Sequence, residues 1–331
     1  EAVTLASGVY RVRASVPSGS KATADMVQTD EAFWTIFSFH FLSGEAFTKA
    51  DCDAGLTRAV LDATTARRLF GTTDAVGRTV QLDYVDYTVA GVVADVSMLA
   101  TAAYAQIWVP YTAAGAEAMS WQNDTMGPMH AIILARSSAD FDAIREETEL
   151  LRKKYNDGLQ DVEVFYRGQP DTQLAYLYRR WYAEPDVPGV MLRYAIVVII
   201  LLLVPAVNLS GMTLSRMRRR MAEIGVRKAF GATGGELMRQ VFFENLVLTL
   251  LAGIVGLALS YVATFALNGF LFSNSMNASL SGETALTPGM LLSPWAFIAA
   301  FAFCLLMNIL SAGIPAWRAS RMNITDAINQ R

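Results

Sequence analysis

The stretch SRMRRRMAEIGVRKAFGAT, residues Ser215–Thr233, decides how this chain is organised. It places five arginines between two long apolar runs, in a chain whose residues are 53% hydrophobic. Dense positive charge beside apolar runs is typical of a loop that stays on the cytosolic side of a membrane. The stretch is therefore interpreted as a cytosolic loop joining two membrane spans.

Charge and apolarity are unevenly divided along the 331 residues, which exceed one average domain. Residues 1–190 hold 16 Lys and Arg against 25 Asp and Glu, a balance of −9; residues 191–331 hold 11 against 5, a balance of +6. Together they give the net charge of −3. Mean hydropathy is +0.31, high for a soluble protein. We predict a soluble domain over 1–188 and an all-α membrane domain over 189–331.

Three apolar runs are long enough to be membrane-spanning helices. In the first, the eight aliphatics of Val197–Val204 contribute about −2.5 to −5 kcal/mol toward insertion, which offsets Asn208. Pro205 removes a backbone hydrogen bond and predicts a kink. Trp295 and Trp317 frame the third run, about 33 Å apart along a helix, as an aromatic belt would. The predicted spans are about 191–212, 246–271 and 295–316.

The loops between these spans indicate their direction. Residues 213–239 carry seven Lys or Arg and two Glu, whereas residues 269–293 carry no Lys or Arg and one Glu. The positive-inside rule puts 213–239 and the C-terminus in the cytosol, and therefore puts residues 1–188 outside. An exported domain needs a signal or a preceding span, and the opening EAVTLASGVYRVRAS is neither. We expect a fourth, N-terminal span ahead of residue 1.

The front domain has the sequence pattern of an α+β fold. Arg78–Val96 is rich in Val and Tyr and breaks around Asp83–Asp86, as a hairpin would. Ala105–Pro110 is expected to form another strand. Ser137–Tyr155 opens on a Ser137–Asp140 capping pattern and continues as an amphipathic helix.

Residues that would carry catalysis are not grouped in this sequence. Only two histidines occur, and His40, among aromatic residues, is interpreted as a packed core residue rather than a ligand; His130 stands alone. Cys52 and Cys304 lie in different halves and are expected to stay unpaired. No G-x-x-x-x-G-K-[ST] loop occurs, so the chain is not expected to bind ATP through a P-loop. We expect no enzyme activity, no bound cofactor or metal, and no nucleic-acid partner.

The Arg-rich loop has an internal structure of its own. From Met217 to Phe230 the pattern is helical, Gly231 ends it, and Thr233–Glu236 matches a capping box that begins the next helix. The predicted geometry is a short helix, a tight corner and a long membrane helix, which suits the transmission of a push from a cytosolic partner. The alternatives are that Arg216–Arg220 only anchor topology at anionic lipid, or that the FGATGG sequence cradles phosphate.

A stripe of small residues follows in the second predicted span. Small residues every four positions let helices approach closely. The stripe therefore predicts contact with a second copy of the chain, with packing inside one chain as the alternative. Its members are Ala252, Gly256, Ser260 and Thr264.

Several motifs resemble the MacB/FtsX-type permeases of ABC transporters. The segment RRRMAEIGVRKAFGATGGELMRQVFFENLVLTLLAGIVGLALSY resembles that family's cytosolic loop and following span, and IPAWRASRMNITDAI resembles its C-terminal end. FLSGEAFTKAD and ARRLFGTTDAVGRTVQLDYVDYTVAGVVADV are similar to its extracytoplasmic domain. The family has four spans, with that domain between the first and second.

The resemblance implies a homodimeric permease in a bacterial plasma (inner) membrane, which couples ATP hydrolysis by a cytosolic ABC ATPase to movement of the outer domain. ATP and Mg would sit on that ATPase, and a periplasmic or outer-membrane protein is a further expected partner. A membrane-anchored enzyme and a scaffold or sensor without ATP coupling are the alternatives. By resemblance the ATPase-coupling residues are Glu223, Ile224, Gly225, Val226, Arg227, Lys228, Ala229, Phe230, Gly231 and Ala232.

Overall fold

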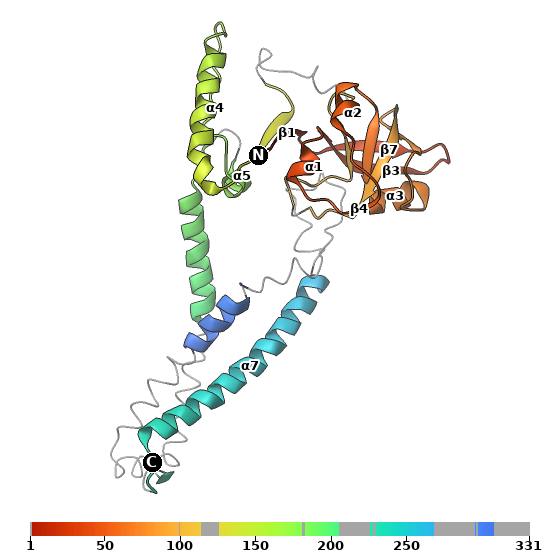
Figure 1. Ribbon diagram of the computed structural model, residues 1–331. Coiled ribbons are helices and arrows are strands. Elements are labelled where there is room, and N and C mark those ends of the chain that lie inside the picture. Colours follow the sequence, from red (N-terminus) through yellow and green to blue (C-terminus); the bar gives the residue numbers. More distant parts are fainter. Residues whose placement is uncertain are drawn as a thin grey trace. The chain divides into compact units, whose positions relative to one another are not determined.

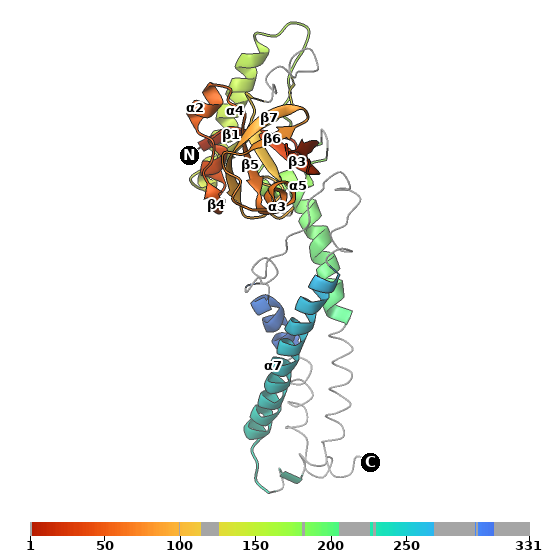
Figure 2. The same ribbon diagram turned by 90° about the vertical axis from the view of Figure 1, so that its right-hand side faces the viewer.

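The computed structural model describes residues 2–98, 100–113, 126–180, 183–204, 226–227, 230–267, 295 and 297–307. Two compact units divide the chain (Figures 1 and 2). The first contains Glu1–Asp171 with Leu267–Leu286, and the second contains Thr172–Ala266 with Thr287–Arg331. Each unit is described by itself below.

One sheet of nine strands organises the described part of the first unit. The strands are β1 Ala2–Ser7, β2 Tyr10–Ser15, β3 Lys21–Thr29, β4 Phe41–Gly44, β5 Arg58–Asp62, β6 Thr79–Leu82, β7 Val85–Val93, β8 Ile107–Pro110 and β9 Met129–Leu134. Its helices are α1 Phe33–Ile36, α2 Lys49–Asp53, α3 Ala63–Phe70, the 3-10 turn η2 Ser138–Asp140 and α4 Phe141–Asn156. The predicted α+β character of this unit is confirmed.

Six of the strands close into a barrel. Neighbours follow the path β2-β6-β7-β5-β8-β3, and β2 also pairs with β3, which returns the path to its start. The long strand β3 makes closure possible, because its first half pairs antiparallel with β2 and its second half pairs parallel with β8. β1 extends the sheet beyond the barrel and pairs along its full length with β9.

The two faces of the barrel strands supply two apolar cores, as period-2 alternation requires. Leu61 of β5 and Ile107 of β8 belong to one core, and their neighbours Val60 and Trp108 belong to the other. The second core is aromatic, and Trp108 lies at its centre with no exposed surface. Its rings meet largely edge to face, as aromatic quadrupoles favour.

The predicted hairpin is confirmed. β6 and β7 pair antiparallel with Leu82 opposite Val85, and the two residues between them, Asp83 and Tyr84, have φ values of +42° and +75°. Two successive positive φ angles are the signature of a type I′ turn, which matches the twist of the flanking strands. The strand predicted over 105–110 is β8, which begins at Ile107.

The predicted amphipathic helix is α4, and its start is as expected. The Ser137 hydroxyl accepts from the Ala139 N–H at 3.2 Å, and Asp140 closes the reciprocal capping box. The turn η2 comes first and α4 begins at Phe141. The four-residue capping pattern Ser137–Asp140 therefore predicted where this helix begins.

The interpretation of His40 as a packed core residue is wrong. His40 is exposed, whereas its neighbours Phe39 and Phe41 are partly buried and pack against Trp34. The chain is extended here as it enters β4, so alternate side chains face opposite sides. The backbone oxygen of His40 accepts from the Ala94 N–H at 2.9 Å, so the residue contributes to the fold through its main chain.

The second unit is helical where it is described. It contains α5 Gln173–Tyr178, a helix Val187–Val204, α7 Gly234–Ala266 and an apolar helix Phe297–Met307. Val187–Val204 and the Phe242–Ala263 part of α7 are long and apolar enough to cross a membrane, with mean hydropathies of 2.5 and 2.3. The share of their residues that is buried is 0% for the first and 6% for the second, whereas the core helix of a soluble protein is mostly buried.

These helices can be set against the predicted spans. The first helix begins four residues before position 191, and positions 205–212, with Pro205 and Asn208, lie outside the described residues. The second ends at Ala266, within the predicted 246–271. For the third, the described part is the shorter Phe297–Met307 helix, so a third span over 295–316 stays a prediction.

Candidate functional site

The candidate site is the corner between the Arg-rich loop and α7, defined as residues 226–240. Val226 and Arg227 are helical, and the Phe230 N–H donates to the Val226 oxygen at 3.1 Å. Gly231 then adopts a φ of +95°, and the Ala232 N–H turns back to the Arg227 oxygen at 3.1 Å. The Ala232–Arg227 bond spans five positions instead of the four of an α-helix, and such a bond across a left-handed glycine is characteristic of a Schellman motif. The predicted helix stop at Gly231 is therefore confirmed.

Thr233 begins the next helix as its N-cap, as predicted. The Glu236 N–H donates to Thr233 Oγ1 at 3.3 Å, and the Glu236 carboxylate accepts from the Thr233 N–H at 2.9 Å. This reciprocal pair satisfies backbone donors that the first turn of α7 leaves without helical partners. The Thr233 N–H and hydroxyl lower the pKa of Glu236 below its usual range. The carboxylate is thus charged at the helix end where negative charge is favoured.

Arg227 and Gln240 fasten the two sides of the corner together. The Arg227 Nη1 donates to Gln240 Oε1 at 2.8 Å, which bridges 13 positions of sequence. Sequence analysis missed Gln240, because two side chains at that spacing meet only once the turn at Gly231 folds the helices toward each other. The bond holds the short helix against the second turn of α7.

The corner leaves apolar surface open. Val226 is 49% exposed and Phe230 is 90% exposed, and their i,i+4 spacing puts them on one helix face. This surface presents an aromatic ring next to a left-handed turn, beside a basic side chain. Of the ten predicted coupling residues, Val226, Arg227, Phe230, Gly231 and Ala232 come together here. The others, Glu223, Ile224, Gly225, Lys228 and Ala229, lie outside the described residues.

The small-residue stripe lies on α7, and three of its members are exposed there: Ala252, Gly256 and Ser260. The fourth, Thr264, has a side chain outside the described set. A Cβ built on Gly256 meets nothing within 4 Å, whereas one built on Gly253 would lie 3.4 Å from the Phe301 ring. The close approach of the Phe297–Met307 helix is therefore at Gly253, one residue off the stripe. Contact of the stripe with a second copy stays a prediction.

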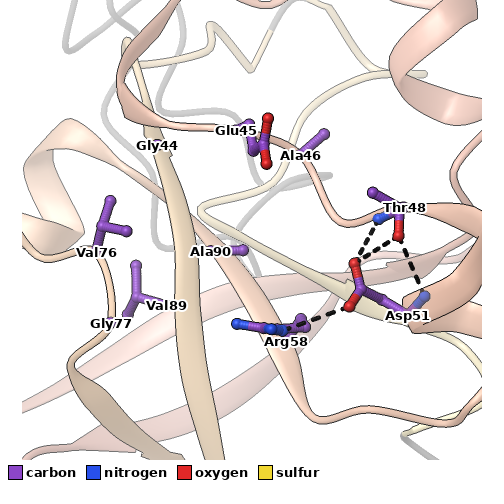
Figure 3. Close-up of a pocket in the computed structure, with 10 residues that line it drawn as sticks. All are labelled: Gly44, Glu45, Ala46, Thr48, Asp51, Arg58, Val76, Gly77, Val89 and Ala90. Carbon is purple, nitrogen blue, oxygen red and sulfur yellow. Dashed lines mark hydrogen bonds and ion pairs between the residues drawn. The ribbon is translucent and has the colours of Figure 1, made fainter.

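The first unit carries a cavity of about 500 Å³ that sequence analysis did not indicate (Figure 3). It lies where β4, β5, β7 and the start of α2 meet. Arg58 pairs with Asp51 at 3.6 Å, and Asp51 also forms a capping box with Thr48, so the pair ties α2 to β5. The hydrogen bonds from Thr48 lower the pKa of Asp51. The lining residues are Gly44, Glu45, Ala46, Thr48, Asp51, Arg58, Val76, Gly77, Val89 and Ala90.

The described residues hold no group of three His, Cys, Asp or Glu that could bind a metal ion. His40 and His130 are both exposed and far apart in sequence. Cys52 and Cys304 are free, as predicted. Burial raises the pKa of the Cys52 thiol to about 12, so it is a neutral core side chain at physiological pH.

Two family descriptions match the chain. MacB-like periplasmic core domain matches residues 1–151, and FtsX-like permease C-terminal matches residues 195–324. These two matches give the class of protein, an ABC transporter permease of the membrane. Because the two matches lie in one chain and in this order, the chain belongs to the MacB/FtsX-type family of these permeases.

Curated relatives agree with this assignment. The chain is 26% identical over 307 residues to the macrolide export ATP-binding/permease protein MacB of Chromobacterium violaceum, which is 92% of this chain and 43% of that protein. It is also 26% identical over 314 residues to MacB of Escherichia coli strain K12, again 43% of its length. The chain therefore spans less than half of the relatives that it matches.

Solved structures of extracytoplasmic domains are also similar. The extracellular domain of the noncanonic ABC-type transporter YknZ from Gram-positive bacteria matches with a TM-score of 0.36 and 18% identity, over 46% of this chain and 75% of that one. The periplasmic region of MacB from Actinobacillus actinomycetemcomitans gives 0.36 and 18%, over 46% and 66%.

Proposed function

We propose that this chain is the permease subunit of an ABC-type mechanotransmission or export system. A cytosolic ABC ATPase, which holds ATP and Mg, docks on the corner, and its cycle moves the membrane helices and reshapes the outer domain. The permease works as a homodimer in a bacterial plasma membrane, with residues 1–188 outside and the 213–239 loop and C-terminus in the cytosol. A periplasmic or outer-membrane protein is its further partner.

The observation that carries this proposal is the corner itself. Three devices fix it: the left-handed Gly231, the Thr233–Glu236 capping box, and the Arg227–Gln240 hydrogen bond. A loop that only anchors topology needs positive charge and no fixed shape. Here a fixed turn holds Phe230 out at 90% exposure and leads directly into a helix apolar enough to cross a membrane. A partner that pushes on Phe230 therefore pushes on α7.

The first unit suits the receiving end of such a movement. A closed barrel, two cores and the Arg58–Asp51 tie hold this unit together, so displacement of its attachment points is transmitted to the whole unit. The membrane helices then transmit this motion to the outer unit, and no substrate channel through the bilayer is needed. Which cargo or target the outer unit acts on is a separate question from this coupling.

Co-purification tests the proposal. The full-length permease is expressed in its native membrane as wild type, Phe230→Asp and Tyr84→Asp, and isolated in mild detergent. Both substitutions place a carboxylate on a highly exposed ring position, at 90% and 84% exposure, and Tyr84 lies in the hairpin turn of the outer unit. Protein bound to each variant is identified by mass spectrometry, and its ATP turnover is measured.

We expect a P-loop ATPase to accompany the wild type and Tyr84→Asp and to be lost with Phe230→Asp. An exposed aromatic at a docking centre costs about 2 kcal/mol or more when it is removed, roughly a 30-fold loss of affinity. Equal recovery of the ATPase with both variants would make the corner a topology anchor. If no ATPase accompanies even the wild type, a scaffold or sensor without ATP coupling becomes the better account of the chain.

A further inference from the structure

The short helix α5, Gln173–Tyr178, exposes an apolar surface just before the first apolar helix. Leu174, Tyr176 and Leu177 are 45%, 49% and 54% exposed. The helix is a formed element, because the Ala175 N–H donates to the Thr172 hydroxyl at 3.2 Å as an N-cap bond. Six residues that expose this much apolar surface require a cover.

A ring contact joins the end of α5 to the following helix. Tyr178, its last residue, lies with its ring 6.2 Å from that of Tyr194, centroid to centroid. Tyr194 marks a sharp change in composition. Arg193 precedes it, and the ten residues Ala195–Val204 that follow contain no charged or polar side chain. Both tyrosines therefore lie where the helix passes from polar to apolar surroundings.

The described residues of the connection to that helix also form hydrogen bonds. Arg179 Nη1 donates to the Ala183 oxygen at 3.1 Å, and the Gly189 N–H donates to Asp186 Oδ1 at 3.0 Å, which caps the helix at its first turn. Val187–Tyr194 adds about 10 Å of helix before the apolar run. The Tyr178–Tyr194 ring contact therefore brings the end of α5 close to the last turn of helix before the apolar run.

The charges around α5 suit a lipid surface. Arg180 and Arg193 are exposed, and Arg179 carries a third cation. The nearby carboxylates in sequence are Asp171, Glu184 and Asp186, of which Asp186 serves as the helix cap. Tyrosines at the level where charge gives way to apolar residues are the usual composition of a membrane interface. Arginine heads reach the phosphates while their stems lie along apolar surface.

We propose that residues 173–180 form an interfacial anchor, which lies at the headgroup–acyl boundary of the outer leaflet. Its leucines and tyrosines enter the lipid, its arginines meet the phosphates, and the Tyr178–Tyr194 contact fixes it to the first span. The anchor sets the height at which the outer unit is attached to the membrane. This inference rests on the proposed function, since it takes Val187–Val204 to enter the bilayer.

Spin-label accessibility tests the anchor in the full-length chain. Cys304→Ala removes the exposed native thiol, Cys52 is 4% exposed and is left in place, and the chain without an added cysteine gives the background. A nitroxide is attached at Leu177→Cys, and collision with O₂ is compared with collision with a water-soluble nickel chelate in phosphatidylcholine–phosphatidylglycerol vesicles.

Two matched positions serve as controls. Leu150→Cys on α4 is 60% exposed and reports water, and Leu201→Cys is 67% exposed and reports the first apolar helix. We expect the O₂-to-nickel ratio at Leu177 to fall between the two, well above that at Leu150. A Leu177 ratio equal to that at Leu150 would overturn the anchor while Leu201 still reports lipid. Protection of Leu177 from both reagents would overturn it in favour of a protein cover. If Leu201 itself contacts the nickel chelate, the membrane placement in the proposed function also fails.

Discussion

Gly231→Ala is the most direct test of the corner as a fixed turn. The residue has a φ of +95°, which side-chain-bearing residues rarely adopt, and a Cβ built there meets nothing within 4 Å. The cost of the substitution is therefore backbone strain alone, about 1–2 kcal/mol. That cost favours local opening of the corner by about 5- to 30-fold.

Hydrogen exchange measured by mass spectrometry on the permease in lipid nanodiscs reads this opening. The reporting amides are those of Phe230 and Ala232, which bond to Val226 and Arg227 across the turn. Their exchange rate follows the equilibrium for local opening, so we expect it to rise about 5- to 30-fold in Gly231→Ala. Gly231→Asn is the matched control, because Asn tolerates the left-handed region better than Ala.

Exchange that is unchanged in Gly231→Ala would refute the reasoning, because it would mean that the turn does not depend on a left-handed residue. Equal acceleration by Ala and Asn would also contradict it, since the effect would then come from the added side chain and not from its backbone preference. We expect exchange to be fastest with Ala at position 231, slower with Asn and slowest with the native Gly.

Three further predictions concern single residues. Thr233→Ala removes one half of the capping box and should speed exchange of the Glu236 amide about fivefold, a loss of about 1 kcal/mol, whereas Thr233→Ser should not. Burial raises the pKa of Asp62 to about 6, so its carboxyl stabilises the fold when protonated, fully below about pH 4, and this contribution is lost as the pH rises through 6. The free energy of urea unfolding of the outer unit, measured in the solubilised chain, should therefore rise in Asp62→Asn relative to wild type by up to about 3 kcal/mol between pH 4 and 7. Unfolding free energies that change in parallel with pH in the two proteins would contradict this. In a Cys304→Ala chain, the buried Cys52 thiol should react with maleimide only on unfolding, and fast labelling of the folded chain would show that the aromatic core opens.

Local signals in the sequence predicted local structure well. The Ser137–Asp140 and Thr233–Glu236 capping boxes, the helix stop at Gly231 and the type I′ hairpin at Asp83–Tyr84 all depend on residues within four positions of each other. In the capping boxes and at Gly231 a backbone requirement selects particular residues, so the pattern and the geometry carry the same information. At the hairpin the sequence predicted the break but not the turn type, because Tyr84 is not a residue that a type I′ turn favours.

Structure that depends on distant residues was not visible in the sequence. Closure of the barrel requires the first half of β3 to pair with β2 and the second half to pair with β8. No sequence pattern within β3 indicates that its two halves have different partners. The Arg58–Asp51 tie and the Arg227–Gln240 bond likewise exist only once the chain has folded. His40 shows a different failure, since a cluster of aromatics was interpreted without its strand parity.

The sequence indicated the candidate site as a stretch, and the structure describes five of its ten residues. The pattern indicated a corner followed by a membrane helix, and the positions of Phe230 and Arg227 on it required coordinates. The small-residue stripe on α7 remains a prediction from composition. Its exposed members are predicted to contact a helix of a second copy, whereas Gly253 is the position that contacts Phe301 within the chain.

One distance measurement tests whether ATP turnover by an ATPase docked at the corner reshapes the outer unit. Nitroxides at Tyr84→Cys, in a Cys304→Ala chain, are measured in the two copies of the co-purified complex by pulsed electron resonance in nanodiscs, with ADP and with ATP plus vanadate. The account predicts a shift of the distance distribution between the two states, which disappears when Phe230→Asp is added. An unchanged distribution in a complex that turns over ATP would contradict it.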